Sequence, residues 1–416
     1  MYLSTSRASD IAGDTPAPRG PLRAVPGTVF ALGLVSLVTD VSAEMVTAVL
    51  PLYLMAGLGM SPLAFGALDG LHQGATAVLR LGGGRIADRT RRHKLVAGTG
   101  YALSAACKAA LLAVATPWSV AAVLAADRTG KGLRTAPRDA LISLSVPPGE
   151  QGRAFGVHRA LDTAGALLGP LAAFGVLWVA VDGYEAVFTV SCCVAVLGVV
   201  LLALFVREAP APAVVRVRAA QPPVRTLLRL PGLRDLCLTA AVLGLFTVGD
   251  AFLYLLLQRR LGLSAAYFPL LPVGTAAVFL LAALPVGRLA DRLGRRRVFL
   301  VGHGLLLGAC LLLLAPVPAG APLVAGVLAA LGLFYAATDG VLMAAAGPLL
   351  PAGLRTTGLA VLQTAQALAR FAGSLLFGSA WTLWGPGAAL GLAATGLLLS
   401  LVAVAVFGGT RADRPS

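Results

Sequence analysis

The chain has 416 residues, of which 58% are hydrophobic and only 12% are charged, and its formal net charge is +15. A soluble domain carries about 25% charged residues, so this composition excludes a water-soluble particle and indicates a polytopic membrane protein. The five cysteines lie in apolar stretches without metal or disulfide-framework spacing, and no nucleotide-binding loop, nucleophile elbow or zinc motif is present, so we expect no metal, no cofactor and no enzyme.

The first segment, 1–27, is polar and proline-rich without the layout of a signal peptide, and we expect a disordered cytoplasmic tail. A helix needs about 20 apolar residues to cross a bilayer. Six such segments follow and build a predicted amino-terminal bundle over 28–206. They centre on 28–55, 62–83, 95–115, 117–146, 153–180 and 185–206.

Helix one carries Asp40 and Glu44, which are four residues apart and therefore share a face. Ionisable groups in a bilayer are costly unless paired or hydrated, so their default interpretation is functional. Two carboxylates close together in a low-dielectric interior suit reversible protonation. Three roles stay open for the pair: carrying a proton, static pairing with helix four or with Arg159 of helix five, and contact with the substrate.

Helix four is the segment richest in charge. At 100° per residue, Asp127, Lys131, Arg134 and Arg138 fall within about 60° of one another, with Arg128 at the flank. Such a stripe must face the central cavity or the helices beside it. Lys131 favours an anionic or carboxylate-bearing substrate, although Asp127, one turn earlier, is a candidate to neutralise it.

Helix five adds Arg159 and Asp162 to the charges of the first half. It also contains Gly165, Gly169 and Pro170. Small residues four apart permit tight helix packing, and a proline bends the helix. We therefore expect a packing motif on this helix.

The second half repeats the plan. A Pro- and Arg-rich stretch, 207–233, is predicted to be a cytoplasmic linker, and a carboxy-terminal bundle over 234–408 precedes a short cytoplasmic tail, 409–416. Its six apolar segments centre on 234–258, 265–286, 298–316, 321–350, 356–382 and 385–408. Its polar candidates for the substrate cavity are fewer: Asp250, Gln363 and Gln366.

One short charged sequence occurs once in each half. Gly84-Arg85-Ile86-Ala87-Asp88-Arg89 recurs as Gly287-Arg288-Leu289-Ala290-Asp291-Arg292, almost half the chain later. Each copy follows the second apolar segment of its half, which indicates internal duplication into two bundles around a shared central site.

These motifs resemble the G-x-x-x-D-R-x-G-R-R loop signature of the major facilitator superfamily, and the likeness covers roughly 28–408. The copy starting at Gly287 matches it in full, whereas the first copy has Arg91 where glycine is usual. The resemblance implies an all-α membrane protein with twelve transmembrane helices in two six-helix bundles. It also implies a cytoplasmic gate, with Asp88 latched near Arg355 and Asp291 near Arg153; Arg85, Arg89, Arg288 and Arg292 belong to the same loops.

Two further motifs are similar to patterns of this superfamily. Arg128-Thr129-Gly130-Lys131-Gly132 resembles R-x-x-Q-G, which implies a role for Arg128 in proton coupling, with Lys131 replacing glutamine. Gly165 to Pro170 resembles the G-x-x-x-G-P motif of the drug antiporters, but Ala173 and Phe174 stand where a glycine pair is usual.

The arginines and lysines gather in alternate loops, and the positive-inside rule makes that face cytoplasmic. Both termini are then cytoplasmic, in the inner membrane. The same distribution explains the basic net charge without nucleic acid, so the expected partners are the bilayer, protons and a small solute, and we expect a monomer.

The sequence therefore predicts a secondary active transporter working by alternating access. We favour proton-coupled efflux, by antiport, of a small organic molecule. The alternatives are uptake or exchange of an anionic solute, such as a carboxylate or a metal–carboxylate chelate, and a non-transporting membrane sensor on the same fold.

Overall fold

A computed structural model of the chain describes residues 27–70, 92–147, 150–180, 183–206, 230–346, 349–350 and 355–412. Several predicted features lie outside these residues. They are the tail up to residue 26, most of the linker (207–229), the end of the carboxy-terminal tail (413–416), and the first copy of the repeated motif with Gly84, Arg85, Asp88 and Arg89.

The amino-terminal half forms helices in the order that its apolar segments predict. α1 ends in a π-helical turn, and the chain is helical again over 62–70. α4 begins where Thr116 and Ser119 form a capping box and Pro117 occupies the first turn, a combination that favours a helix start. The bounds are α1 Gly27–Leu52, η1 Tyr53–Gly57, α3 His93–Leu111, α4 Pro117–Leu144, α5 Gln151–Val179 and α6 Tyr184–Phe205.

The carboxy-terminal half is also helical. α14 contains two spans joined at Gly385, whose φ of 85° and following proline break the helix where the sequence divides its last two segments. The bounds are α8 Pro231–Leu245, α9 Asp250–Leu261, η3 Ala265–Tyr267, α10 Leu270–Leu293, α11 Arg295–Leu314, α12 Ala321–Thr338, α13 Val341–Ala346 and α14 Arg355–Ala412.

Two predicted continuous helices are interrupted. The segment expected over 234–258 divides into α8 and α9 at Phe246–Gly249, and the one expected over 321–350 divides into α12 and α13 at Asp339–Gly340. Gly340 takes a positive φ of 80°, which favours glycine. Each break coincides with a short polar stretch, Thr247 to Asp250 and Thr338 to Gly340, but the flanking residues are apolar, so the sequence predicts one continuous span in each case. Irregular backbone at membrane depth is tolerated where it lines a cavity or is buried in protein.

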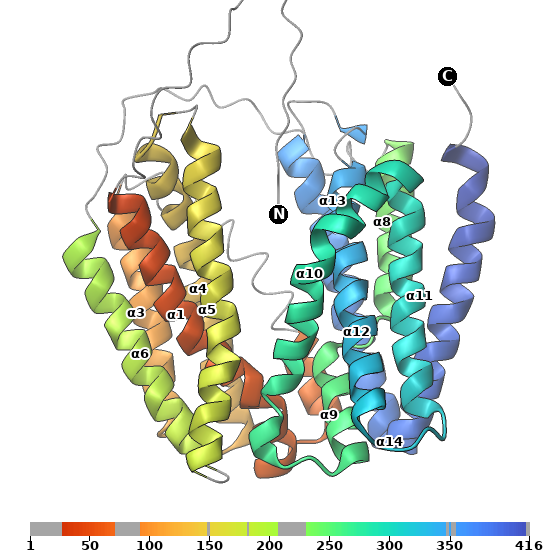
Figure 1. Cartoon of the computed structure of the whole chain (residues 1–416), viewed down its shortest axis with the longest axis horizontal. Helices are drawn as coiled ribbons and strands as arrows, with labels where there is room; N and C mark the ends of the chain where they lie inside the picture. Colours follow the sequence, from red (N-terminus) through yellow and green to blue (C-terminus); the bar gives the residue numbers. More distant parts are fainter. Residues whose placement is uncertain are drawn as a thin grey trace, which may run out of the picture.

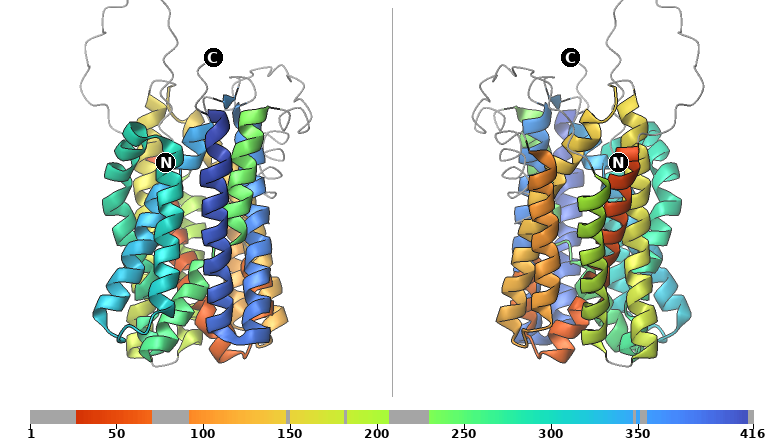
Figure 2. Two further views of the ribbon diagram at one scale, coloured as in Figure 1. Left: turned by 90° about the vertical axis from the view of Figure 1, so that its right-hand side faces the viewer. Right: turned by 90° about the vertical axis from the view of Figure 1, so that its left-hand side faces the viewer.

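The helices form two bundles, one from each half of the chain (Figure 1). In the first bundle α1 packs against α5 and α6, and α3 packs against α4; in the second, α8 packs against α14 and α12 against α10 and α11. The start of α1 and the end of α14 lie at the same end of the molecule (Figures 1 and 2). The bundles meet at the opposite end and diverge toward this one.

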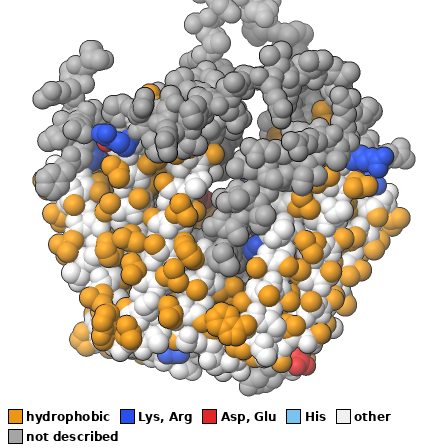
Figure 3. Space-filling view, turned by 180° about the vertical axis from the view of Figure 1, so that it is seen from behind, with side chains coloured by type: hydrophobic (Ala, Val, Ile, Leu, Met, Phe, Trp, Pro, Cys, Tyr) orange, Lys and Arg blue, Asp and Glu red, His pale blue; other side chains and the backbone are white. Residues whose placement is uncertain are grey.

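The flank of the molecule is apolar, as a lipid-facing surface requires (Figure 3). Eight described helical segments are long and apolar enough to cross a membrane, and the last of them, Gly358–Val406, includes the two spans of α14. The fold is an all-α membrane architecture of twelve transmembrane helices in two six-helix bundles, as the sequence predicts.

Candidate functional site

The charged stripe of α4 points into the amino-terminal bundle. Asp127, Arg128 and Arg134 are all buried, with 5%, 7% and 3% of their surface exposed. Their partners come from the adjoining helices α1 and α3. The stripe therefore faces neighbouring helices, which is one of the two arrangements that its periodicity allows.

Asp40 of α1 is a centre of this polar interior. Its carboxylate lies 3.4 Å from Nη2 of Arg134 and 4.0 Å from Nζ of Lys131. The Asp162 carboxyl of α5 lies beside it. Arg134 is further held by the ring of Tyr101, 4.4 Å from its guanidinium carbon, a cation–π contact. Helices one, four and five thus meet at one carboxyl pair.

Lys131 is shared between the two carboxylates of α1. Its Nζ lies 3.9 Å from Glu44 and 4.0 Å from Asp40, both beyond the 2.7–3.2 Å of a hydrogen bond. The side chains of Lys131 and Glu44 are about a quarter exposed, at 26% and 27%. These contacts are loose and partly hydrated, so they can change with protonation at little cost.

A second set of ion pairs continues from this centre along α4 and α5. Arg138 donates to Ser36 at 2.9 Å, pairs with its neighbour Asp139 at 2.9 Å, and lies 3.6 Å from Asp162. Arg159, 65% exposed, contacts the other oxygen of Asp162 at 3.4 Å. Pairing of Asp40 with Arg159 was one of the roles left open, but Arg159 contacts Asp162, which lies one turn away on α5.

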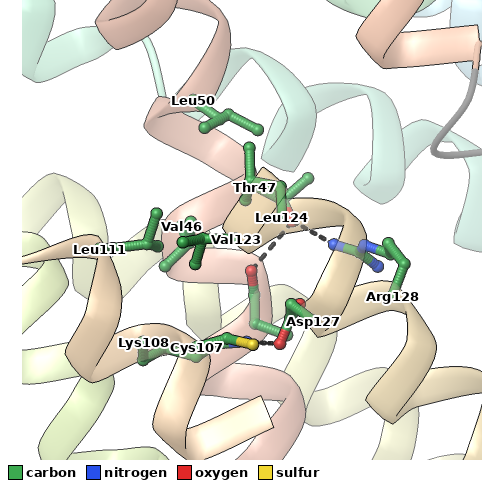
Figure 4. A pocket seen from close by; sticks show the side chains of 11 residues that line it. Val46, Thr47, Leu50, Cys107, Lys108, Leu111, Val123, Leu124, Asp127 and Arg128 are labelled. Atoms are coloured by element: carbon green, nitrogen blue, oxygen red, sulfur yellow. Dashed lines mark hydrogen bonds and ion pairs between the residues drawn. The ribbon is translucent and has the colours of Figure 1, made fainter. Parts of the chain in front are cut away.

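Deeper in the bundle, Lys108 of α3 and Asp127 form a direct hydrogen-bonded ion pair (Figure 4). Both side chains are at most 7% exposed. Asp127 therefore neutralises Lys108, and the alternative that it neutralises Lys131 is wrong. The packing of α3 against α4 determines this pairing, because it places the ammonium group of Lys108 against the Asp127 carboxylate.

Arg128 is adjacent to this pair and reaches across to α1. Its Nη2 lies 3.4 Å from the Thr47 hydroxyl, and its Nε is buried without a hydrogen-bond partner among the described residues (Figure 4). A buried guanidinium that is only partly satisfied is costly. Arg128 thus lies between α1 and α4 with only part of its hydrogen-bonding capacity used among the described residues.

The glycines of helix five make close contacts with α1. A Cβ at Gly165 would collide with the carbonyl oxygen of Leu37, and one at Gly169 would lie 2.8 Å from that of Val41 and 2.6 Å from Cβ of Glu44. Pro170 is buried within the same helix. This close approach brings the backbones of α1 and α5 together beside Asp40 and Asp162.

The carboxy-terminal bundle places two of its charges, Asp250 and Arg370, at a cavity beside the break between α8 and α9. A cavity of about 160 Å³ there is lined by Asp250, Arg370, Tyr335 and Ser374, together with Asp69 of the helix over 62–70. Asp69 accepts a hydrogen bond from the Ser374 hydroxyl at 3.1 Å, which joins the two bundles. Asp250 and Arg370 thus face one cavity.

Gln363 and Gln366 lie on α14, one to two turns before Arg370. At 100° per residue all three fall within about 60° of one another. Gln363 is exposed and Gln366 is partly buried. The structure therefore places both glutamines on the face of α14 that carries the cavity residue Arg370.

The second copy of the repeated motif, Gly287 to Arg292, lies in the last turns of α10 rather than in a loop. Among the described residues nothing lies within 4 Å of a Cβ placed on Gly287, and the turn after α10 is made by Gly294 with φ 96°. Asp291, 69% exposed, pairs with Arg295 at 3.3 Å.

The predicted latch spans the end at which the bundles diverge, so the pairing of Asp291 with Arg153 of α5 stays a prediction for a conformation in which these ends meet. Arg295 also donates to the carbonyl of Ala344 at the end of α13. The side chain of Arg355 and the first copy of the motif lie outside the described set.

Some residues of these sites have no distinctive sequence signal. Thr47, Ser36 and Tyr335 are neutral and occur in apolar helices, so only the fold shows their contacts. Asp69, Lys108 and Arg370 do carry a signal, since each is a charge inside a predicted span, but the sequence does not reveal their partners.

Comparison with known proteins agrees with this architecture. The model of the Major Facilitator Superfamily matches residues 32–374 and 236–416. An uncharacterized MFS-type transporter of Methanocaldococcus jannaschii is 28% identical over 364 residues, covering 85% of this chain and 88% of that protein. The multidrug resistance protein MdtH of Cronobacter sakazakii is 35% identical over 114 residues, 27% of this chain and 28% of MdtH.

Among solved structures, the nucleoside transporter NupG is similar with a TM-score of 0.77 at 14% identity, covering 91% of this chain and 99% of NupG. At that identity the likeness concerns the fold alone. The family match over most of the chain and the two-bundle fold agree, and the chain belongs to the major facilitator superfamily of membrane transporters.

Proposed function

We propose that this transporter couples proton movement to the efflux of a small organic molecule across the inner membrane, by antiport. The observation that carries the proposal is the loose contact of Lys131 with Asp40 and Glu44, at 4.0 and 3.9 Å, with Asp162 beside Asp40. The carboxyl groups of Asp40 and Asp162 contact each other, and two carboxyl groups in contact in a low-dielectric interior favour holding a proton between them.

Protonation would have a mechanical consequence. A neutral Asp40 no longer attracts Arg134 and Lys131, so the attraction between α1 and α4 weakens. Because α5 is packed against α1 at Gly165 and Gly169, a shift of α1 is transmitted to the helix that meets the other bundle. If the carboxyl group binds a proton more tightly in one orientation of the bundles than in the other, protonation shifts the equilibrium toward that orientation.

The orientation follows from the arginine-rich loops, which favour a cytoplasmic location for the end at which the bundles diverge. The conformation is then open to the cytoplasm, where an efflux transporter loads its substrate. The partial likeness to a protein named for multidrug resistance supports the same direction.

The alternative of anionic solute transport depended on Lys131 as a free cation. Both Asp40 and Glu44 lie within 4.0 Å of Lys131, so its charge is largely compensated inside the bundle. This observation favours the organic-molecule proposal over the anionic one. A sensor without solute turnover would move no solute at all.

The test uses the purified chain in proteoliposomes with an acidic lumen and a trapped pH-sensitive dye. Each of a panel of small amines, carboxylates and neutral solutes is added outside. Antiport predicts that a transported solute enters and collapses the gradient, because protons leave in exchange. We expect Asp40→Asn and Glu44→Gln to abolish this collapse, and Asp235→Asn, a partly exposed carboxylate beside Arg234, to behave as wild type.

Solute uptake that ignores the pH gradient in wild type would contradict proton coupling. Uptake driven only by the opposite gradient would indicate symport and the uptake alternative. If no solute moves under either gradient, the sensor hypothesis is favoured instead.

A further inference from the structure

The cavity at the break of the seventh transmembrane helix differs from the charged centre in the amino-terminal bundle. It is lined by α9, α12 and α14 of one bundle and by Asp69 of the other. The backbone at Thr247, Val248 and Gly249 is non-helical and lies on its wall. Interrupted helices at membrane depth are typical of places where a transporter presents polar groups to a solute.

One side of the cavity is acidic. Asp250 is the first residue of α9, and its Oδ1 accepts a hydrogen bond from the Ala251 amide at 3.1 Å. The side chain of Tyr335 lines the cavity beside it. Asp69 contributes a second carboxylate, with Oδ2 bound to the Ser374 hydroxyl. Two carboxylates facing a shared small volume attract a cationic group.

The other side of the cavity is basic. Arg370 of α14 lines it, and its Nε is buried without a hydrogen-bond partner among the described residues. A buried N–H of a charged group that lacks an acceptor is costly, and native structures normally satisfy it with a partner, a water or a ligand. Because Arg370 lines the cavity, its guanidinium group offers a cationic donor for an oxygen acceptor next to the two carboxylates.

We propose that this cavity binds the transported solute, and that the solute is a small molecule with a cationic amine and, a few bonds away, a carboxylate or carbonyl oxygen. The amine is held by Asp250 with Asp69, and the oxygen by Arg370. This substrate class rests on the proposed transport function. It adds to that function the chemistry of the cargo and a location outside the proton-carrying centre.

The placement of the cavity suits a transported solute. Its wall includes residues of both bundles, so a bound molecule touches both halves at once. A volume of about 160 Å³ restricts the ligand to a small molecule. The mixed charge of the lining selects against purely anionic compounds, which contact Arg370 but bring no cation to compensate Asp250 and Asp69.

The experiment measures binding by thermal stabilisation of the detergent-purified full chain with three probes of matched length: γ-aminobutyrate, n-butylamine and butyrate. Ligands that bind the native state raise its melting temperature. We expect γ-aminobutyrate to act at concentrations about tenfold lower than n-butylamine, because it adds a charge-assisted hydrogen bond, and butyrate to have no effect.

Two variants separate the two sides of the cavity. Asp250→Asn, which keeps an acceptor for the Ala251 amide, should weaken binding of both amines by about tenfold or more. Arg370→Gln should remove the preference for γ-aminobutyrate while leaving n-butylamine binding in place. Asp235→Asn, outside the cavity, should match wild type.

The inference is wrong if wild type binds none of the three probes, binds butyrate as well as γ-aminobutyrate, or binds all probes equally in both variants. Should Asp250→Asn fail to fold, the preference in Arg370→Gln decides. Gradient collapse measured on the same preparations keeps the two proposals apart. If solute movement is proton-driven but this binding pattern is absent, the proposed function stands and the proposed binding site is wrong. If the binding pattern is present but solute movement is not proton-driven, the binding site stands and the proposed function is wrong.

Discussion

At the scale of single residues, the buried charges of the amino-terminal bundle divide into two kinds. Lys108 and Asp127 form a direct, nearly fully buried pair, whereas Lys131 lies 3.9–4.0 Å from two carboxylates and is 26% exposed. A dry hydrogen-bonded pair is costly to separate, and a loose hydrated contact is not. The first kind holds helices together, and the second is suited to change state during transport.

This distinction predicts a thermodynamic cycle. Asp127→Asn leaves the Lys108 ammonium buried without its counter-charge and should cost about 3 kcal/mol. The double variant Lys108→Met with Asp127→Asn removes both charges and should recover most of the loss, since the Lys108 ammonium is then no longer buried without a counter-charge. Thermal melting in detergent measures the cycle. A double variant as unstable as the single one would show that the loss of stability does not come from an unpaired Lys108.

At the scale of elements, glycines decide how closely the helices approach. Gly165 on α5 meets the backbone of α1, and Gly373 on α14 meets the carbonyl of Leu245 at the end of α8. The two contacts join corresponding helices of the two halves. The sequence indicates the first through its spaced glycines, but it does not distinguish packing glycines from those facing open space, such as Gly175.

The contrast between these glycines is testable within one helix. Gly165→Ala places a methyl group against the Leu37 carbonyl and should cost about 1–3 kcal/mol through overpacking. Gly175→Ala on the same helix has no described residue within 4 Å of the new atom and should leave the melting temperature unchanged or raise it, because alanine favours helix more than glycine. Equal effects of the two substitutions would contradict the packing role.

At the scale of the whole molecule, the two bundles are joined at one end by aromatic contacts. Tyr267 of η3 lies 6.0 Å from Phe174 and 5.8 Å from Trp178 of α5, measured between ring centroids. Residues 62–70 pack against α14 nearby, where Gly66 meets the carbonyl of Ser374. Rocking of the bundles to the opposite conformation must separate these surfaces.

A cross-linking experiment measures that separation. In a cysteine-free background, Phe174→Cys with Tyr267→Cys should react with a short bis-maleimide and lose transport, because the closed end can no longer open. Tyr53→Cys with Tyr184→Cys, whose rings are 5.4 Å apart within one bundle, should cross-link with little effect on transport. Full transport by the cross-linked inter-bundle pair would exclude rocking at this end.

The sequence alone determined the properties that depend on composition and period: a membrane protein, two duplicated halves, helix positions, and the face of α4 on which its charges lie. These follow because bilayer thickness and helical geometry act on each segment separately. Only the tertiary structure decided which charges meet. Asp127 pairs with Lys108 and not with Lys131, and Asp250 shares a cavity with Arg370 and Asp69. Partner choice depends on helix rotation, depth and the breaks in helices seven and ten, and these are set by packing between segments far apart in the chain.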